Sequence, residues 1–240
     1  MNTCIFDLDG TLLPMPDQEL FLNTYFKALA AKFSPLGYDS EKLLKAVWTG
    51  TKAMLDNDGT MTNEQLFWST FEGLVEESKE LEPLFNEFYQ KEFHMARSTT
   101  EAHPNASECV RILKEKGYTL ALATNPLFPR VATHARLNWA GLDPADFELI
   151  TTYENSNYCK PKLEYYEQVL EKLGKKAEEC IMIGNDVKED MCAAGLGMDT
   201  FLLKDCLICP EDQDITCYRQ GDFDELLALV TELPDHRNAS

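Results

Sequence analysis

The chain has 240 residues, of which 44% are hydrophobic and 26% charged. Its 41 acidic and 22 basic residues give a formal net charge of −19 at pH 7. This composition excludes a disordered, collagen-like or coiled-coil chain, and is typical of one sizeable globular core with room for a small second domain. Because such a charge repels polyanions, we expect binding neither to nucleic acid nor to an anionic membrane.

The sequence also bears on the compartment. No run approaches the roughly 20 apolar residues that a membrane span needs, and the amino-terminal residues lack the basic-then-apolar pattern of a secretory leader. The eight cysteines are scattered through apolar segments and do not form the dense framework of a small secreted protein. We therefore expect reduced thiols and a cytoplasmic location.

Short apolar runs of strand length recur along the chain, with helical patterns between them. These runs cover residues 3–6, 118–123, 147–150, 180–183 and 200–203. A helical pattern follows the third run, with Pro161 in its first turn and Gly174 at its end. Strands that alternate with helices predict an α/β fold built on a parallel sheet.

Residues 17–97 have a different pattern, because strand-like runs disappear and long amphipathic helical patterns dominate. This change predicts an all-helical cap domain at residues 17–97, inserted into an α/β core formed by residues 1–16 and 98–240. The linkers would lie near residues 13–16 and 98–104. An insertion that directly follows the loop after the first strand is placed to cover that loop.

Acidic residues follow two of the predicted strands. Asp7 and Asp9 come directly after the first strand, where Gly10 permits a sharp turn. Asp186 and Asp190 follow the strand at 180–183, at the start of a predicted helix that ends near residue 195. Open α/β sheets bind ligands at the carboxyl ends of their strands, and carboxylate clusters supply the oxygen ligands that Mg²⁺ prefers.

Hydrogen-bond donors stand at two further strand ends. Thr124 and Asn125 end the run at 118–123, and Lys160 precedes the helix that starts near Pro161. A hydroxyl, an amide and an ammonium group can all donate to phosphate oxygens.

The order of these motifs is D-L-D-G-T at 7–11, T-N at 124–125, K-P at 160–161 and G-N-D-x-x-x-D at 184–190. In this order the chain resembles the haloacid dehalogenase (HAD) superfamily, and the helical insertion has the position of that family's C1 cap. The resemblance implies a Rossmann-like parallel sheet core. It also implies a Mg²⁺-dependent phosphatase that hydrolyses a small soluble phosphate monoester through an aspartyl-phosphate.

The resemblance also implies a role for each motif residue. Asp7 would attack phosphorus, and Asp9 would protonate the leaving oxygen and then activate water. Thr124 and the Asn125 backbone would bind the phosphoryl group, and Lys160 would offset the charge between nucleophile and phosphate. Because dehalogenases of this superfamily lack the second aspartate, Asp9 favours phosphoryl transfer.

The same resemblance implies a magnesium site. Its ligands would be the Asp7 carboxylate, the Asp9 backbone carbonyl and Asp186. Asp190 would support the site directly, through water or by orienting Lys160.

Three other functions stay open at this stage. A phosphomutase or a phosphonate hydrolase would use the same core, and the latter needs a cap lysine for a Schiff base, for which Lys52 is the candidate. A phosphometabolite-binding regulatory module could keep the fold without activity. The substrate and the oligomeric state are not determined by the sequence.

Two further patterns are interpreted as structural. The D-N-D-G-T at 56–60 repeats the first motif, but no strand precedes it, so we expect a loop between cap helices. Cys206, Cys209 and Cys217 lack a nearby fourth ligand, so a structural zinc site is not expected.

Overall fold

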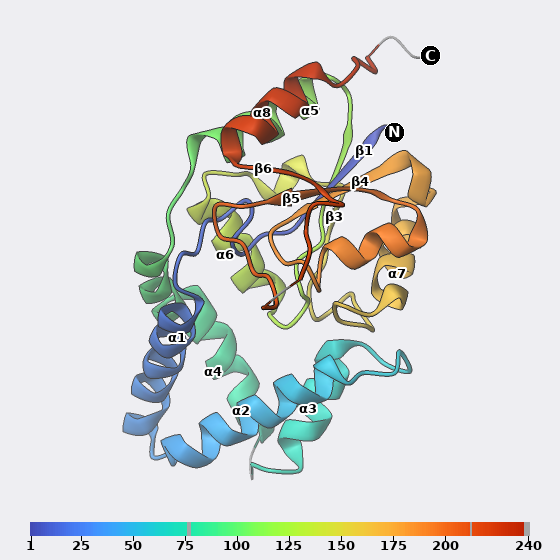
Figure 1. Cartoon of the computed structure of the whole chain (residues 1–240). Coiled ribbons are helices and arrows are strands. Elements are labelled where there is room, and N and C mark those ends of the chain that lie inside the picture. Colours follow the sequence, from blue (N-terminus) through green and yellow to red (C-terminus); the bar gives the residue numbers. More distant parts are fainter. Residues whose placement is uncertain (76–77, 212, 238–240) are drawn as a thin grey trace.

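The computed structural model describes residues 1–75, 78–211 and 213–237, so residues 76–77, 212 and 238–240 of the predicted cap and core ranges lie outside the described part. Six strands form one parallel sheet in the order β3-β2-β1-β4-β5-β6 (Figure 1). They are β1 (Thr3–Phe6), β2 (Thr119–Leu122), β3 (Leu149–Ile150), β4 (Cys180–Gly184), β5 (Asp199–Leu203) and β6 (Arg219–Gly221). The predicted parallel α/β fold is confirmed.

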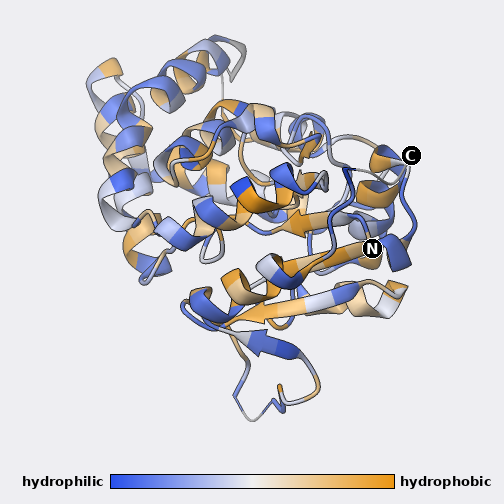
Figure 2. Ribbon diagram, turned by 90° about the horizontal axis from the view of Figure 1, so that it is seen from above, coloured by the Kyte–Doolittle hydropathy of each residue, from blue (hydrophilic) through white to orange (hydrophobic). Residues whose placement is uncertain are grey.

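The central strand, β1, is buried on both faces of the sheet. Cys4 and Phe6 belong to the hydrophobic cluster that includes residues of α5 (Pro104–Glu115), α6 (Arg130–Trp139) and α8 (Phe223–Glu232). Ile5 belongs to a second cluster with residues of α7 (Leu163–Leu173). Helices that cover both faces explain why the inner strands read as continuous apolar runs, drawn in orange in Figure 2.

One strand was not predicted, and one local prediction was wrong. Strand β6 was missed because Arg219, Gln220 and Gly221 carry no apolar signal, as befits an edge strand paired only with β5. No α-helix begins at Asp186, and η5 (Met191–Leu196) is a 3-10 helix. Residues 187–190 form turns instead, and the Asp190 side chain folds back so that its Oδ2 accepts a hydrogen bond from Asp186 N at 2.9 Å.

The helix after the K-P motif is present, but it begins at Leu163, two residues beyond Pro161. Its predicted end is confirmed, since Gly174 stands at the carboxyl terminus with φ of 61°. Two short 3-10 turns, η3 (Pro144–Asp146) and η4 (Ala177–Glu179), precede β3 and β4.

Among the described residues, the elements between β1 and α5 are all helical. They are α1 (Gln18–Phe33), η1 (Ser34–Leu36), α2 (Ser40–Leu55), α3 (Asn63–Glu72), α4 (Ser78–Gln90) and η2 (Glu92–Thr99). Asp17, Asp39 and Thr62 cap the starts of α1, α2 and α3 with side-chain oxygens. Figure 1 shows α1 and α4 leading away from the sheet to α2 and α3. In the described part of the chain, no helix combines the length and hydrophobicity needed to cross a membrane.

Aromatic packing joins the helical segment to the sheet domain. Phe93 stacks on Trp139 of α6 with ring centroids 5.2 Å apart, and Phe21 meets Phe128 edge-on at 6.5 Å. A second contact lies at the loop between α2 and α3, where Lys162 Nζ donates to Asn57 O at 2.6 Å. The D-N-D-G-T at 56–60 forms this loop, so the prediction of a loop between helices is confirmed.

Candidate active site at the carboxyl edge of the sheet

The loop after β1 is held against the loop after β4. Asp7 N donates to Ile183 O at 2.9 Å, and Thr11 Oγ1 donates to Asn185 Oδ1 at 2.9 Å. Gly10 has φ of +87°, and a Cβ there would lie 2.3 Å from the Asn185 amide nitrogen. Only glycine therefore fits this turn, which brings the two carboxylate motifs to one edge of the sheet.

A buried lysine joins the two motifs. Lys160 Nζ donates to Asp7 Oδ1 at 2.8 Å and to Asp190 Oδ1 at 2.6 Å, and its side chain is 1% exposed. Burial opposes the ammonium form, but the adjacent Asp190 and Asp7 carboxylates outweigh it and hold the pKa of Lys160 well above its usual range. Lys160 is therefore a fixed positive charge behind Asp7.

The two aspartates after β4 have different surroundings. Both oxygens of Asp190 accept hydrogen bonds, Oδ1 from Lys160 and Oδ2 from Asp186 N at 2.9 Å. A Cβ on Gly184 would lie 2.1 Å from Asp190 Oδ2, so this glycine makes room for the carboxylate. Asp186 uses Oδ1 for the Lys188 and Glu189 amides, whereas its Oδ2 receives no hydrogen bond from any described residue.

An ion pair that sequence reasoning missed holds Asp9. Arg136 of α6 binds Asp9 Oδ2 through its guanidinium, and the arginine side chain is 1% exposed. Burial raises the pKa of Asp9, Arg136 opposes this, and the neighbouring Asp7 adds to it. No motif indicates Arg136; the available signal is an arginine in the interior of α6, between Ala135 and Leu137.

The loop after β2 supplies a hydroxyl and an amide. Thr124 O is fixed by hydrogen bonds from Thr151 Oγ1 and Tyr165 OH, each 2.8 Å long. Asn125 Nδ2 donates to both oxygens of Glu189, at 3.2 and 3.1 Å. Burial raises the pKa of Glu189, Lys160 opposes the shift, and Asp186 and Asp7 add to it. Sequence reasoning passed over Glu189, although it lies between the two aspartates of its motif.

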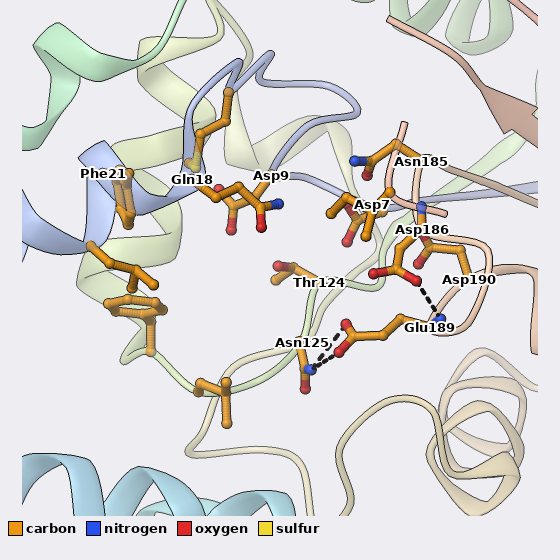
Figure 3. Close-up of a pocket in the computed structure, with 15 residues that line it drawn as sticks. Asp7, Asp9, Gln18, Phe21, Thr124, Asn125, Asn185, Asp186, Glu189 and Asp190 are labelled. Carbon is orange, nitrogen blue, oxygen red and sulfur yellow. Dashed lines mark hydrogen bonds between the residues drawn. The ribbon is translucent and has the colours of Figure 1, made fainter. Parts of the chain in front are cut away.

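These side chains surround a cavity of about 250 Å³ (Figure 3). Six predicted residues line it: Asp7, Asp9, Thr124, Asn125, Asp186 and Asp190. Lys160 lies behind Asp7 and does not line the cavity. Lys52 is exposed on α2 and does not line it either.

The donor chemistry of the cavity fits a magnesium ion. Among the described residues no three His, Cys, Asp or Glu side chains form a ready-made metal cage. Asp9 is directed to Arg136, Asp190 to Lys160 and Glu189 to Asn125. Asp7 and Asp186 each use Oδ1 for hydrogen bonds and keep an Oδ2 that receives none from a described residue, so these two carboxylates remain as oxygen donors to a metal. Mg²⁺ often uses one or two carboxylates and takes its other ligands from water and substrate phosphate, so this set is compatible with it.

The chain belongs to the haloacid dehalogenase-like hydrolases, whose family model matches residues 1–195. Pyrophosphatase PpaX from Bacillus cereus is 27% identical over 186 residues, covering 78% of this chain and 75% of the relative. A HAD phosphatase from Thermococcus onnurineus has a similar structure, with a TM-score of 0.58, 19% identity and coverage of 96% and 98% of the two chains. YfnB from Bacillus subtilis, a HAD-hydrolase whose crystal structure is bound to magnesium, has a TM-score of 0.56 and 20% identity, with coverage of 96% of this chain and 98% of that chain.

Proposed function

We propose that the protein is a Mg²⁺-dependent phosphatase that hydrolyses a small phosphate monoester through an aspartyl-phosphate on Asp7. The observation that carries the proposal is the position of Lys160 between Asp7 and Asp190 at the cavity. A carboxylate can attack a dianionic phosphate only where the repulsion between them is offset, and a buried lysine beside the nucleophile provides part of that offset.

The reaction would take place in two steps. An Asp7 oxygen forms a bond to phosphorus while the ester P–O bond breaks, and the proton of Asp9 passes to the leaving oxygen. In the second step Asp9 takes a proton from water, the water oxygen bonds to phosphorus, and the Asp7 carboxylate is released with inorganic phosphate. Asp9 begins and ends the cycle protonated, so the protons balance.

The phosphoryl group would be bound by the loop after β2, and Lys160 would offset its charge. Thr124 lines the cavity, and the backbone of Asn125 follows it. Lys160 contributes charge from behind Asp7 and does not itself reach into the cavity.

Magnesium would be held by the Asp7 carboxylate, the Asp9 backbone carbonyl and Asp186. Asp190 would act by orienting Lys160, since both of its oxygens already accept hydrogen bonds. When bound, the ion neutralises charge on the phosphoryl oxygens.

We place the cap at residues 17–97 and the core at residues 1–16 and 98–240. The support for this division is that Gln18, Phe21 and Leu22 of α1 line the cavity that the core carboxylates share. All eight cysteines are unpaired, which supports a location in the cytoplasm. The phosphonate-hydrolase alternative is disfavoured because Lys52 does not line the cavity.

The test is the hydrolysis of p-nitrophenyl phosphate with and without Mg²⁺, for the wild type and for Asp7→Asn. We expect metal-dependent turnover that Asp7→Asn abolishes. The matched control is Asp56→Asn, which makes the same change in the second D-x-D-G-T pattern, at an exposed position after α2. A regulatory binding module would show no turnover in any variant.

A further inference from the structure

The cavity has two chemically different sides (Figure 3). One side carries Asp186, Glu189 and Asn125. The other carries Asp9 together with Gln18 and Phe21 of α1. Phe128, which pairs with Phe21, and Leu22 of α1 also line the cavity. Since Asp9 is the proposed proton donor to the leaving oxygen, the alcohol part of the ester must extend into this second side.

Apart from Asp9, the second side offers aromatic and aliphatic surface with the uncharged amide of Gln18. Phe21 and Phe128 meet edge-on at 6.5 Å, and Leu22 keeps 39% of its surface exposed. Gln18 is exposed at the first turn of α1 and supplies an uncharged amide. An uncharged group with an apolar face matches these side chains, because its burial needs no counter-charge.

No described residue that lines the cavity is a lysine or an arginine. The two cations next to it are already engaged, Lys160 by Asp7 and Asp190, and Arg136 by Asp9, and both side chains are 1% exposed. Five carboxyl groups line the cavity against these two cations. Even with Asp9 protonated and a divalent cation bound, the entry of a phosphate dianion makes the summed charge negative.

We infer that this site selects phosphate monoesters of uncharged, partly apolar alcohols or phenols, and discriminates against esters whose leaving group carries a carboxylate or a second phosphate. The inference rests on the proposed phosphatase function and adds the substrate class. Gln18 is the position at which an added charge would change this selectivity, because it is an uncharged side chain of α1 that lines the leaving-group side.

The experiment compares two esters of matched shape, 4-carbamoylphenyl phosphate and 4-carboxyphenyl phosphate, with pyrophosphate as a third substrate. We expect kcat/KM to be at least about tenfold higher for the uncharged carbamoyl ester, and pyrophosphate to be the poorest substrate. Ionic strength is held constant, because screening reduces repulsion between charges.

Two substitutions of equal length test the position itself. Gln18→Lys brings a positive charge to the leaving-group side. It should reduce the ratio of kcat/KM for the carbamoyl ester to that for the carboxyl ester at least about fivefold, mainly by lowering KM for the carboxyl ester. Gln18→Met removes the amide without adding charge, and it should keep the preference. Leu20→Lys adds the same charge on the same turn of α1, at a residue that is 50% exposed and does not line the cavity, so it should also keep the preference.

The outcomes separate the two levels of the argument. The inference is overturned if kcat/KM for the two aryl esters differs by less than twofold, or if Leu20→Lys and Gln18→Lys change the preference equally. Either result leaves the phosphatase function standing. Failure to hydrolyse either aryl ester or p-nitrophenyl phosphate with Mg²⁺ overturns the proposed function and the inference with it. A wild-type preference for the uncharged ester that only Gln18→Lys reduces supports both.

Discussion

Arg136 binds one oxygen of Asp9 and leaves the other without a hydrogen-bond partner among the described residues. The guanidinium also lies over the ring of Phe128, with 4.5 Å from its carbon to the ring centroid. Arg136 is therefore fixed on two sides, and it fixes Asp9 on the side of the cavity that α1 lines. Oδ1 itself is buried, so the part of this carboxylate that solvent reaches is on the Arg136-bound side.

The first prediction concerns this pair. Arg136→Met should lower kcat by about 10²-fold for alkyl phosphates and much less for p-nitrophenyl phosphate, because a good leaving group needs little protonation. The measurement is the slope of log kcat against the pKa of the leaving group. A purely structural defect would lower kcat for all substrates alike and would leave this slope unchanged. Arg136→Lys should recover part of the loss, and Arg111→Met, at an exposed arginine of α5, should cost nothing. Equal losses on both substrates would contradict the positioning role.

A second prediction addresses the acid and base directly. Asp9→Asn keeps the size of the side chain but cannot transfer a proton, so we expect kcat to fall by roughly 10²–10⁴-fold. Asp7→Asn should abolish turnover, because the amide is not a nucleophile. Trapping of a phosphorylated enzyme separates the two, since a labelled wild type or Asp9→Asn protein and an unlabelled Asp7→Asn protein are expected. Label retained in Asp7→Asn would assign the nucleophile elsewhere.

The third prediction tests the metal ligands. EDTA should abolish activity and Mg²⁺ should restore it. Asp186→Ala should raise the Mg²⁺ concentration needed for half-maximal rate, because it removes one of the two proposed carboxylate ligands. Direct titration of Mg²⁺ binding by calorimetry gives a readout that does not depend on turnover. An unchanged Mg²⁺ affinity in Asp186→Ala would contradict its role as a ligand.

Glu189 provides a prediction on stability and pH. Burial raises its pKa in the folded protein above the unfolded value, so folding favours the protonated form. Burial of Glu189 therefore costs no stability at a pH below the pKa that its carboxyl group has in the unfolded chain. Stability is lost as the pH rises from there through the higher pKa that this group has in the folded protein. Glu189→Gln should therefore raise Tm at pH 7–8 in EDTA and lose this advantage near pH 4. Thermal unfolding across this range checks it, and an advantage independent of pH would refute it.

The sequence predicted the parallel sheet and the carboxylate motifs because both are encoded locally. Apolar runs reveal buried strands, and Gly10 and Gly184 mark places where backbone and side chains approach closely. Arg136 and Gln18 could not be found this way, because the role of each side chain depends on which distant residues the fold brings next to it. Arg136 is 127 positions from Asp9, and Gln18 enters the cavity only through the path of α1.

The last prediction concerns the loop between α2 and α3, which joins the helical segment to the segment that leads to Lys160. Asn157 Nδ2 donates to Gly59 O at 3.0 Å, and Asn63 N donates to Ser156 O at 2.8 Å. Gly59 has φ of +91°, and a Cβ there would lie 2.1 Å from the Tyr158 hydroxyl. Gly59→Ala must therefore displace either the Tyr158 side chain or the loop, and it also strains the backbone.

A matched control is available at Gly37, which has φ of +92° and where a Cβ would meet no described atom within 4 Å. Gly37→Ala should cost only the backbone strain of about 1–2 kcal/mol, whereas Gly59→Ala should cost clearly more and lower Tm further. Gly59→Ala should also reduce kcat/KM, since the displaced loop no longer holds the helical segment against the core. Equal losses of Tm in the two variants, with unchanged kcat/KM, would show that this contact does not position the cap.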